Sequence, residues 1–427
     1  MFQIRILSLV LTCFSLSLLT SCTSSPPPHS SVQEGLKLGT VLPKSGNIIS
    51  GLDLSKAAAL AVEEVNACGG VNGKPVTLIQ EDSQGEAVQG AIAITKLAEE
   101  DRVAGVVGAR FSGVSNIVID VAVRNRVMLI SPSSTSPMFT NRAGRGDFRG
   151  FWARTVPSDI HQAKALASVA RQRGIKTLAT IAVSNNYGIG FERQLVNIFD
   201  KLGGRVLDDQ NPIRYAAQGQ NFDQETTAIL AKNAQAIVGI FSTEEGKLIL
   251  QSSNGQNFGK KAQLLLTDAV YSQKFIKQVG KNEEGDWILA GALGTVPGSK
   301  LEESDITAKW QEKLGTADVS TYFPHTWDAT VLLMLAAQAS QTNTGTGIKG
   351  QIRQVSNAPG VEVRDPCQAL KLLREGKEIN YQGVSGAVDM DEYGDVISPY
   401  RVWQVKEDGT LAVIDQVEPL QPELDIR

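Results

Sequence analysis

Cysteine and histidine are scarce in this chain of 427 residues, which contains four cysteines and three histidines. The histidines, His29, His161 and His325, lie far apart in the sequence, and no CxxC pair occurs. A structural zinc site usually combines four such ligands at short spacing. The sequence therefore predicts no metal site.

Long runs of positive charge are also missing. Lysine and arginine together number 41, against 45 aspartate and glutamate residues, which gives a formal net charge of −4. Surfaces that bind nucleic acid are strongly basic. We therefore expect no nucleic-acid partner.

Local motifs of common enzymes are absent as well. There is no GxSxG nucleophile elbow and no GxxxxGK[ST] phosphate-binding loop. Residues 345–350 read GTGIKG and match GxGxxG, but they follow a predicted helix and we place them in a loop, which disfavours a dinucleotide site. We expect no cofactor and no enzyme. A dispersed catalytic triad, as in an extracytoplasmic hydrolase, stays open as an alternative.

The apolar run at the N-terminus is too short for a typical membrane span. Arg5 precedes an apolar stretch at 6–20 that serine and threonine interrupt, whereas a span needs about 20 apolar residues. The stretch ends in LTSC at 19–22 and resembles a bacterial lipoprotein signal. This resemblance implies a signal peptide at 1–21 and lipidation of Cys22. An ordinary signal peptide and a single span are the alternatives.

A polar, proline-rich segment follows Cys22. Residues 23–33 read TSSPPPHSSVQ, a composition that buries no core and favours an extended chain. We expect a flexible tether at 22–35 that links a lipid anchor in the membrane to a folded part outside the cytoplasm.

Two cysteines, Cys68 and Cys367, remain after this segment, because Cys13 lies in the predicted signal. In an oxidising compartment they would form one disulfide, and the alternative is two buried free thiols. Sequence does not fix the distance between the two residues, so both alternatives stay open.

From residue 36 onward, short apolar runs alternate with longer amphipathic segments, which is typical of parallel strands joined by crossover helices. A first series predicts strands at 36–42, 76–80, 103–107 and 127–130, with helices at 54–65, 86–100 and 113–125. A second series predicts strands at 177–183, 236–240, 263–266 and 287–293, with helices at 160–173, 191–202 and 245–253. Further helices are expected at 305–314 and 322–339, and a hairpin at 400–405 and 411–417. The length and the repeated series predict two α/β domains.

Two polar loops follow successive predicted strands of the first series. Residues 108–113 read GARFSG, and residues 131–137 read SPSSTSP. Open parallel sheets bind ligands at the carboxyl ends of their strands, and hydroxyl groups beside a helix N-terminus suit a carboxylate. Each loop alone would pass as a capped turn, but the two together predict a binding site for an anionic group.

Several segments together resemble a known family. They are LPKSG at 42–46, AVEEVNACGGVNG at 61–73, ISPSSTSP at 130–137, RTVPSD at 154–159 and SGAVDMDEYGDV at 385–396. They look like the periplasmic leucine/isoleucine/valine-type binding proteins, the class I solute receptors of ABC importers. The resemblance runs from about residue 36 to about residue 417.

That resemblance implies an α/β fold of two Rossmann-like lobes with parallel sheets, joined by a three-strand hinge near residues 155, 293 and 396. Lobe I would comprise 36–154 and 294–395, and lobe II would comprise 155–293 and 396–427. Ligand would dock on the first lobe, and the second lobe would then close over it.

The resemblance also implies the ligand contacts of the first lobe. Ser112 and Thr135 match hydroxyl residues that hold the ligand carboxylate. Ser133 and Ser134 match neighbours whose backbone contacts the same group. Alternatively, Ser112 would be a simple helix N-cap.

From the second lobe, Asp268 matches the acid that faces the ligand ammonium, and Tyr187 matches an aromatic that closes over the ligand. Alternatively, Asp268 would cap the helix after its strand and Tyr187 would be a surface turn residue. Arg110 departs from the family pattern, because a purely aliphatic pocket would not favour a buried charge. We expect it to contact a polar or acidic ligand side chain.

These expectations combine into one predicted function. The chain would be a monomeric, lipid-anchored receptor that captures an amino acid or related small carboxylate or amide and delivers it to an ABC permease. The alternative is a sensory lipoprotein that uses the same cleft to signal to a membrane partner.

Overall fold

The computed structural model describes residues 35–45, 54–298, 305–315 and 319–418. The predicted signal peptide, the lipidation site Cys22 and nearly all of the predicted tether lie outside the described residues, as does the last residue of the LPKSG motif. Among the described helices, none combines the length and apolar character that crossing a membrane requires.

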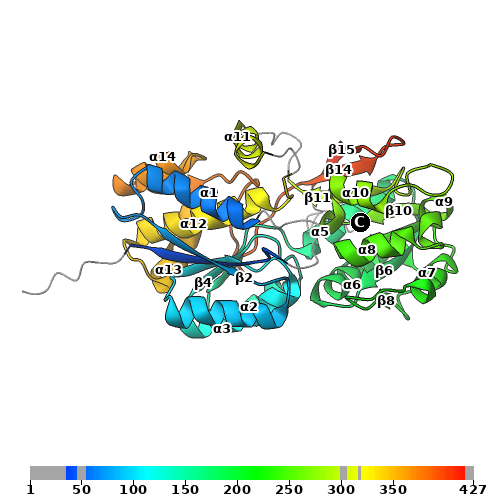
Figure 1. The fold of residues 1–427 in the computed structure, drawn as a ribbon, viewed down its shortest axis with the longest axis horizontal. Coiled ribbons are helices and arrows are strands. Elements are labelled where there is room, and N and C mark those ends of the chain that lie inside the picture. The colour runs from blue at the N-terminus through cyan, green and yellow to red at the C-terminus, as the bar shows by residue number, and fades with distance from the viewer. Residues whose placement is uncertain (1–34, 46–53, 299–304, 316–318, 419–427) are drawn as a thin grey trace, which may run out of the picture. The chain divides into compact units, whose positions relative to one another are not determined.

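The first lobe is built on a five-stranded parallel sheet with the strand order β2-β1-β3-β4-β5. The strands are β1 (Lys37–Leu42), β2 (Thr77–Asp82), β3 (Gly105–Gly108), β4 (Met128–Ser131) and β5 (Trp152–Arg154). One face carries α1 (Leu54–Ala67), α12 (Phe323–Ser340), α13 (Gly345–Ser356) and α14 (Pro366–Arg374). The other face carries α2 (Ala87–Thr95), the π-helical turn η1 (Lys96–Glu100), α3 (Ser112–Asn125) and α4 (Met138–Gly144) (Figure 1). The lobe also contains α11 (Asp305–Leu314) and a small parallel pair, β12 (Val361–Val363) and β13 (Ile379–Tyr381).

Alternating side chains of the strands supply the two cores of this lobe. Leu38 of β1 and Val107 of β3 belong to the core beneath α1 and α12, whereas Val41 and Val106 belong to the core beneath α2 and α3. Successive residues of a strand point to opposite faces of its sheet. A strand covered on both faces therefore reads as a continuous apolar run, which is why these strands were predictable.

The second lobe repeats this strand order. Its parallel strands β6 (Thr177–Val183), β7 (Arg205–Val206), β9 (Ala236–Ile240), β10 (Gln263–Leu266) and β11 (Leu293–Pro297) lie in the order β7-β6-β9-β10-β11. The antiparallel hairpin β14 (Tyr400–Val405) and β15 (Leu411–Val417) extends the sheet beyond β11, and β8 (Ile213–Tyr215) pairs with β6. The hairpin confirms the one predicted at 400–405 and 411–417.

Helices also cover both faces of the second sheet. One face carries α5 (Asp159–Gln172) and α6 (Asn186–Lys201). The other carries α7 (Asp223–Leu230), α8 (Thr243–Gln251), α9 (Phe258–Lys261) and α10 (Gln273–Val279), with the short 3-10 turns η2 (Gly255–Asn257) and η3 (Asp268–Val270) nearby.

Three segments connect the lobes. The chain enters the second lobe between β5 and α5, returns after β11, and enters the second lobe again before β14. Strand β11 pairs within the second sheet as far as Pro297. The lobe boundaries expected at 154, 293 and 395 stay a prediction.

Two local predictions were wrong. The strand predicted at 287–293 does not form: Trp287 makes only an isolated bridge to Lys281, and Gly291, with φ +78°, turns the chain before β11 begins. The predicted loop at 345–350 is instead the first part of α13. Thr344 is the N-cap residue of this helix, and its hydroxyl accepts a hydrogen bond from the Gly347 N–H at 3.2 Å. The glycines masked the helical spacing of the buried Ile348, Ile352 and Val355.

A disulfide joins Cys68, just after α1, to Cys367 in α14, with Cα atoms 5.6 Å apart. This distance is ordinary for a disulfide. The bridge links two residues that are 299 positions apart in sequence and fastens together two helices on the same face of the first sheet.

Candidate ligand-binding site

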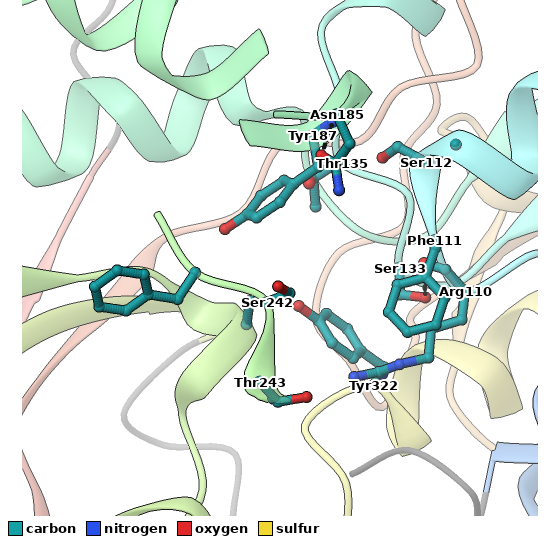
Figure 2. Close-up of a pocket in the computed structure, with 13 residues that line it drawn as sticks. Arg110, Phe111, Ser112, Ser133, Thr135, Asn185, Tyr187, Ser242, Thr243 and Tyr322 are labelled. Carbon is teal, nitrogen blue, oxygen red and sulfur yellow. Dashed lines mark hydrogen bonds between the residues drawn. The ribbon is translucent and has the colours of Figure 1, made fainter. Parts of the chain in front are cut away.

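A pocket of about 80 Å³ lies where loops of the two lobes meet. Its walls come from the carboxyl ends of β3, β4, β6, β9 and β10 and from the residue before α12. The lining residues are Arg110, Phe111, Ser112, Gly113, Ser133, Thr135, Asn185, Tyr187, Phe241, Ser242, Thr243, Ala269 and Tyr322 (Figure 2). Carboxyl ends of parallel strands are where open α/β sheets bind ligands.

Five of the seven predicted ligand contacts line this pocket. They are Arg110, Ser112, Ser133, Thr135 and Tyr187. The other two, Ser134 and Asp268, are not in its lining but are buried directly beside lining residues.

Hydrogen bonds hold the two first-lobe loops together. The Ser133 hydroxyl donates to the Arg110 carbonyl at 2.9 Å, and the Ser136 N–H donates to the Ser112 hydroxyl at 3.4 Å. Ser134 lies behind the wall, where its hydroxyl contacts that of Ser115 at 2.8 Å. The N-cap residue of α3 is Phe111, so Ser112 is the first helical residue and not a simple N-cap.

A buried arginine forms hydrogen bonds with the loop at 131–137. Both Ser134 and Ser136 offer their carbonyls to Arg154 Nη1, at 3.0 and 3.1 Å. The same guanidinium makes a two-pronged ion pair with Asp395, with distances of 2.6 Å from Nε and 2.9 Å from Nη2. Bidentate, charge-assisted pairs of this kind fix geometry as well as charge. The loop that carries Thr135 is therefore attached to the segment that leads to the last lobe crossing.

The second lobe contributes an aromatic side chain held in a defined place. Asn185 caps α6 by accepting from the N–H groups of Tyr187 and Gly188 at 3.0 Å. The Tyr187 hydroxyl contacts the Thr267 hydroxyl at 2.7 Å. Tyr187 thus lines the pocket and is not a surface turn residue.

Two buried carboxylates lie next to the pocket. Asp268 Oδ2 accepts from the Tyr322 hydroxyl at 2.8 Å. Asp268 Oδ1 and both Oδ atoms of Asp159 are buried and lack a hydrogen bond of good geometry among the described residues. Polar groups lie near them, because Thr135 lowers the pKa of Asp159 and Gln162 lowers that of Asp268. Ser272, and not Asp268, caps α10. Unpartnered buried carboxylate oxygens are costly, so this region favours a ligand group that donates hydrogen bonds and carries positive charge.

Burial acts on both acids, and repulsion by Asp268 acts on Asp159 as well. Burial raises the pKa of Asp159 well above its usual range, and the negative charge of Asp268 raises it further. Burial likewise raises the pKa of Asp268, while the hydrogen bond from Tyr322 lowers it. A cationic ligand group between the two would favour their ionised forms.

Sequence reasoning missed Asp159. The available signal was its place at the end of the RTVPSD segment, directly after the N-cap residue Ser158 of α5. Its N–H donates to the Thr135 carbonyl at 2.8 Å, which brings α5 to the ligand loop of the first lobe. Phe241, Ser242 and Thr243 were also missed, although they follow the carboxyl end of β9.

The far wall of the pocket carries a buried cation between aromatic rings. Arg110 is 6% exposed, and its guanidinium carbon lies 5.1 Å from the Phe111 ring centre and 5.3 Å from that of Tyr322. Figure 2 shows Ser112, Thr135 and Tyr187 on one side of the pocket and Arg110 and Tyr322 on the other. In the described part of the chain, no group of His, Cys, Asp or Glu side chains is arranged to hold a metal ion.

Two α/β lobes with a polar pocket between their strand ends are the arrangement of the two-lobed ligand-binding proteins. The family model described as the receptor family ligand binding region matches residues 53–408, and the chain belongs to this family. Its fold is that of the type I periplasmic binding proteins.

Individual proteins agree with this assignment. The chain is 26% identical over 382 residues to the chemotactic signal transduction system substrate-binding protein BasB of Halobacterium salinarum, covering 87% of each chain. It is 24% identical over 392 residues to Leu/Ile/Val-binding protein homolog 1 of Brucella suis, covering 89% of this chain and 93% of that one.

Solved structures show the same fold. The leucine-binding protein LivK of Thermotoga maritima superposes with a TM-score of 0.73 at 22% identity, over 90% of this chain and 99% of that one. LivJ of Streptococcus pneumoniae, in complex with isoleucine, gives 0.72 at 20% identity, over 90% of this chain and all of that one. These relatives are binding proteins rather than enzymes.

Proposed function

We propose that the protein is an extracytoplasmic receptor that captures an amino acid, or a related small carboxylate or amide, between its lobes and delivers it to an ABC permease. The observation that carries this proposal is the presence of hydroxyl-rich loops in the wall of one pocket, with two buried carboxylates directly behind that wall. A zwitterion needs neutral donors at one end and negative charge at the other. The names of the Brucella relative and of the two solved structures support an amino acid as ligand.

Each predicted contact has a role in this proposal. Ser112 and Thr135 would bind the ligand carboxylate through their hydroxyls, with the backbone of Ser133 and Ser134 beside them. Asp268 would bind the ammonium, with Asp159 as a second acceptor. Charge-assisted hydrogen bonds are the stronger kind, and micromolar affinity requires about 8 kcal/mol in total.

Tyr187 would cover the ligand from the second lobe, as its position in the pocket supports. Contacts from both lobes are necessary, because a ligand shifts a conformational equilibrium only through a difference in its affinity for the two states.

We further propose that the ligand side chain meets Arg110, which favours a polar or acidic side chain over a purely aliphatic one. The test is Arg110→Met, with calorimetric affinities for L-glutamate and L-leucine. The ratio of the two affinities should move towards leucine by about tenfold or more, since a buried ion pair is lost. An unaltered ratio would reject the role of Arg110.

The membrane anchor is part of the same proposal. Lipidation of Cys22 and the tether at 22–35 would hold a monomeric receptor near its permease. One lipid chain binds a membrane weakly, whereas several hold it firmly. Mass spectrometry of the membrane-extracted protein would detect the lipid on Cys22, and an unmodified N-terminus or retention of residues 1–21 would contradict the proposal.

The decisive experiment identifies the ligand. A soluble form that begins after Ser25 would be screened by thermal shift against amino acids, amides, urea and small carboxylates, because a ligand that binds only the folded state raises its stability. For an α-amino acid hit, Asp268→Asn should weaken binding by at least about tenfold. The matched control is Asp415→Asn, an exposed acid on β15. Equal affinities of the two variants would remove Asp268 from the ammonium role.

The name of the Halobacterium relative favours a second candidate function. The protein would be a sensory receptor whose closed, ligand-bound form is recognised by a signalling partner. A deletion strain separates the two functions. Loss of radiolabelled amino acid uptake would support import. Normal uptake with a lost behavioural response to the same amino acid would support sensing.

A further inference from the structure

A short turn of the first lobe reaches across to the acidic side of the pocket. Thr321 and Tyr322 directly precede α12. The Tyr322 hydroxyl donates to Asp268 Oδ2 at 2.8 Å, and the Thr321 hydroxyl donates to the Tyr271 carbonyl at 3.2 Å. Both acceptors belong to the turn that follows β10 in the second lobe. Two hydrogen bonds therefore join the lobes at one point.

Tyr322 is buried against the first lobe and one lobe crossing. The residue is 7% exposed and packs with Leu42 and Leu54 of the first lobe and with Val156 of the segment between β5 and α5. Its ring also stands beside the Arg110 guanidinium at the pocket wall. This packing fixes the position from which the hydroxyl reaches the second lobe.

Other hydrogen bonds between the lobes end elsewhere. The Ser136 hydroxyl donates to the Asn186 carbonyl at 2.8 Å, and the Gln218 side chain donates to Glu86 Oε1 at 2.9 Å. The Asp159 N–H donates to the Thr135 carbonyl at 2.8 Å. None of these three bonds ends on Asp268. The Tyr322 bond is different, because it ends on the carboxylate that our proposed function assigns to the ligand ammonium.

We propose that Tyr322 is a positioning residue that couples lobe closure to recognition of the ligand amino group. Its hydroxyl occupies Oδ2 of Asp268 and orients Oδ1 towards the ligand. Separation of the lobes would break this bond and remove the donor that the first lobe provides to the carboxylate. Such coupling is reciprocal: closure strengthens ammonium binding, and ammonium binding strengthens closure. The inference rests on the proposed function.

The test is Tyr322→Phe, which keeps the ring and removes only the hydroxyl. Binding of L-leucine and L-glutamate would be followed by stopped-flow fluorescence and calorimetry. The dissociation rate constant should rise by about tenfold to a hundredfold, as expected for loss of a hydrogen bond to a charged group. The association rate constant should stay within about twofold, because docking on the open first lobe precedes closure.

Two control variants separate this role from a general loss of structure. Thr321→Val removes the weaker, neutral bond and should raise the dissociation rate less than Tyr322→Phe does. Tyr393→Phe removes a hydroxyl from a half-buried tyrosine outside the pocket lining and should change neither rate constant. An equal effect of Tyr393→Phe and Tyr322→Phe would overturn the inference.

The pH dependence of ligand affinity gives a further test, because a purely structural role of Tyr322 would leave it unchanged. Asp268 also interacts with Asp159 on α5, Tyr187 on α6 and Tyr400 on β14. Because the Tyr322 bond lowers the pKa of Asp268, its loss raises that pKa. Acidification should then weaken ligand binding at a higher pH in Tyr322→Phe than in the natural protein. Coinciding profiles would count against the inference.

Failure of the proposed function leaves the inference testable. If the natural protein binds neither amino acid, hydrogen–deuterium exchange of both ligand-free forms reports on the contact itself. The turn at 268–271 should exchange faster in Tyr322→Phe. Identical exchange would overturn the inference, and binding of either amino acid by both forms with equal dissociation rates would overturn it too.

Discussion

At the scale of single residues, the pocket depends on side chains that the ligand would never touch. Arg154 is fully buried, and it joins the carbonyls of the Thr135 loop to Asp395 near the last lobe crossing. Removing one partner of a buried ion pair leaves an uncompensated charge in the interior. Removal of Arg154 should therefore both distort the loop that carries Thr135 and destabilise the first lobe.

Arg154→Met should lower the free energy of unfolding by about 3–5 kcal/mol, because Asp395 is left buried and unpaired. Urea denaturation measures this loss. Lys260→Met is the control: Lys260 pairs with Glu284, but both side chains are largely exposed, and screening by water makes such pairs weak. Similar losses in the two variants would contradict the assigned importance of the buried pair.

A buried histidine makes stability depend on pH near another crossing. His325 Nδ1 contacts the Thr155 carbonyl, and the Thr155 hydroxyl donates to the His325 carbonyl, both at 2.8 Å. Burial lowers the pKa of His325 to about 4 from an ordinary value of 6.5. Between these two pH values only the unfolded state binds the proton on His325. The contribution of His325 to the free energy of unfolding is therefore fully present above pH 6.5 and is lost as the pH falls towards 4.

We expect the free energy of unfolding to fall by about 3 kcal/mol more in the natural protein than in His325→Gln over this range of pH. Urea denaturation at several pH values measures the difference. His161, which has a similarly low pKa through burial, is present in both proteins and cancels. Parallel pH profiles would show that His325 does not carry the effect.

At the scale of elements, the sequence predicted those strands and loops that the local pattern of apolar and polar residues determines. Continuous apolar runs identified strands such as β6, β9 and β10, and the predicted loops after β3 and β4 do line the pocket. The glycines of α13 hid a helix, because packing against a core outweighs local preference. At 287–293 the apolar run predicted a strand, but the turn at Gly291 interrupts the chain there. The electrostatic interaction of Asp159 with Asp268 was not predictable, since it joins two elements distant in the sequence.

The disulfide is the element-scale feature with the clearest energetic consequence. Replacing Cys68 and Cys367 together by serine should lower the free energy of unfolding by about 2–4 kcal/mol, because the unfolded chain regains the freedom that a long closed loop removes. Guanidinium denaturation measures the loss, and reduction of the natural protein with dithiothreitol should reproduce it. If the oxidised protein and the double variant unfold at the same denaturant concentration, the bridge contributes nothing.

At the scale of the whole molecule, two lobes of equal strand order approach each other closely at Gly190. Gly190 in α6 lies against the first lobe, where an added Cβ would be 2.9 Å from Pro137 Cδ and 3.1 Å from the Ser136 hydroxyl. Pro137 belongs to the same loop as Thr135. A larger side chain at position 190 would therefore obstruct closure without entering the pocket.

Gly190→Leu should weaken ligand binding by about tenfold or more, since overpacking a contact of this kind costs about 1–3 kcal/mol in the closed state. Small-angle scattering should show a larger radius of gyration at subsaturating ligand. Gly350→Leu is the control, because a Cβ at this glycine of α13 meets nothing within 4 Å. Unchanged affinity in Gly190→Leu would mean that the lobes do not close through this contact.

The bridge between Cys68 and Cys367 also makes lobe motion easier to observe. Both cysteines of the described residues are in this disulfide, and a form that begins after Ser25 contains no other cysteine, so it has no free thiol. Two cysteines introduced on opposite lobes would then be the sole targets for maleimide dyes. Single-molecule fluorescence transfer could follow opening and closing directly, on a protein whose native thiols need no removal.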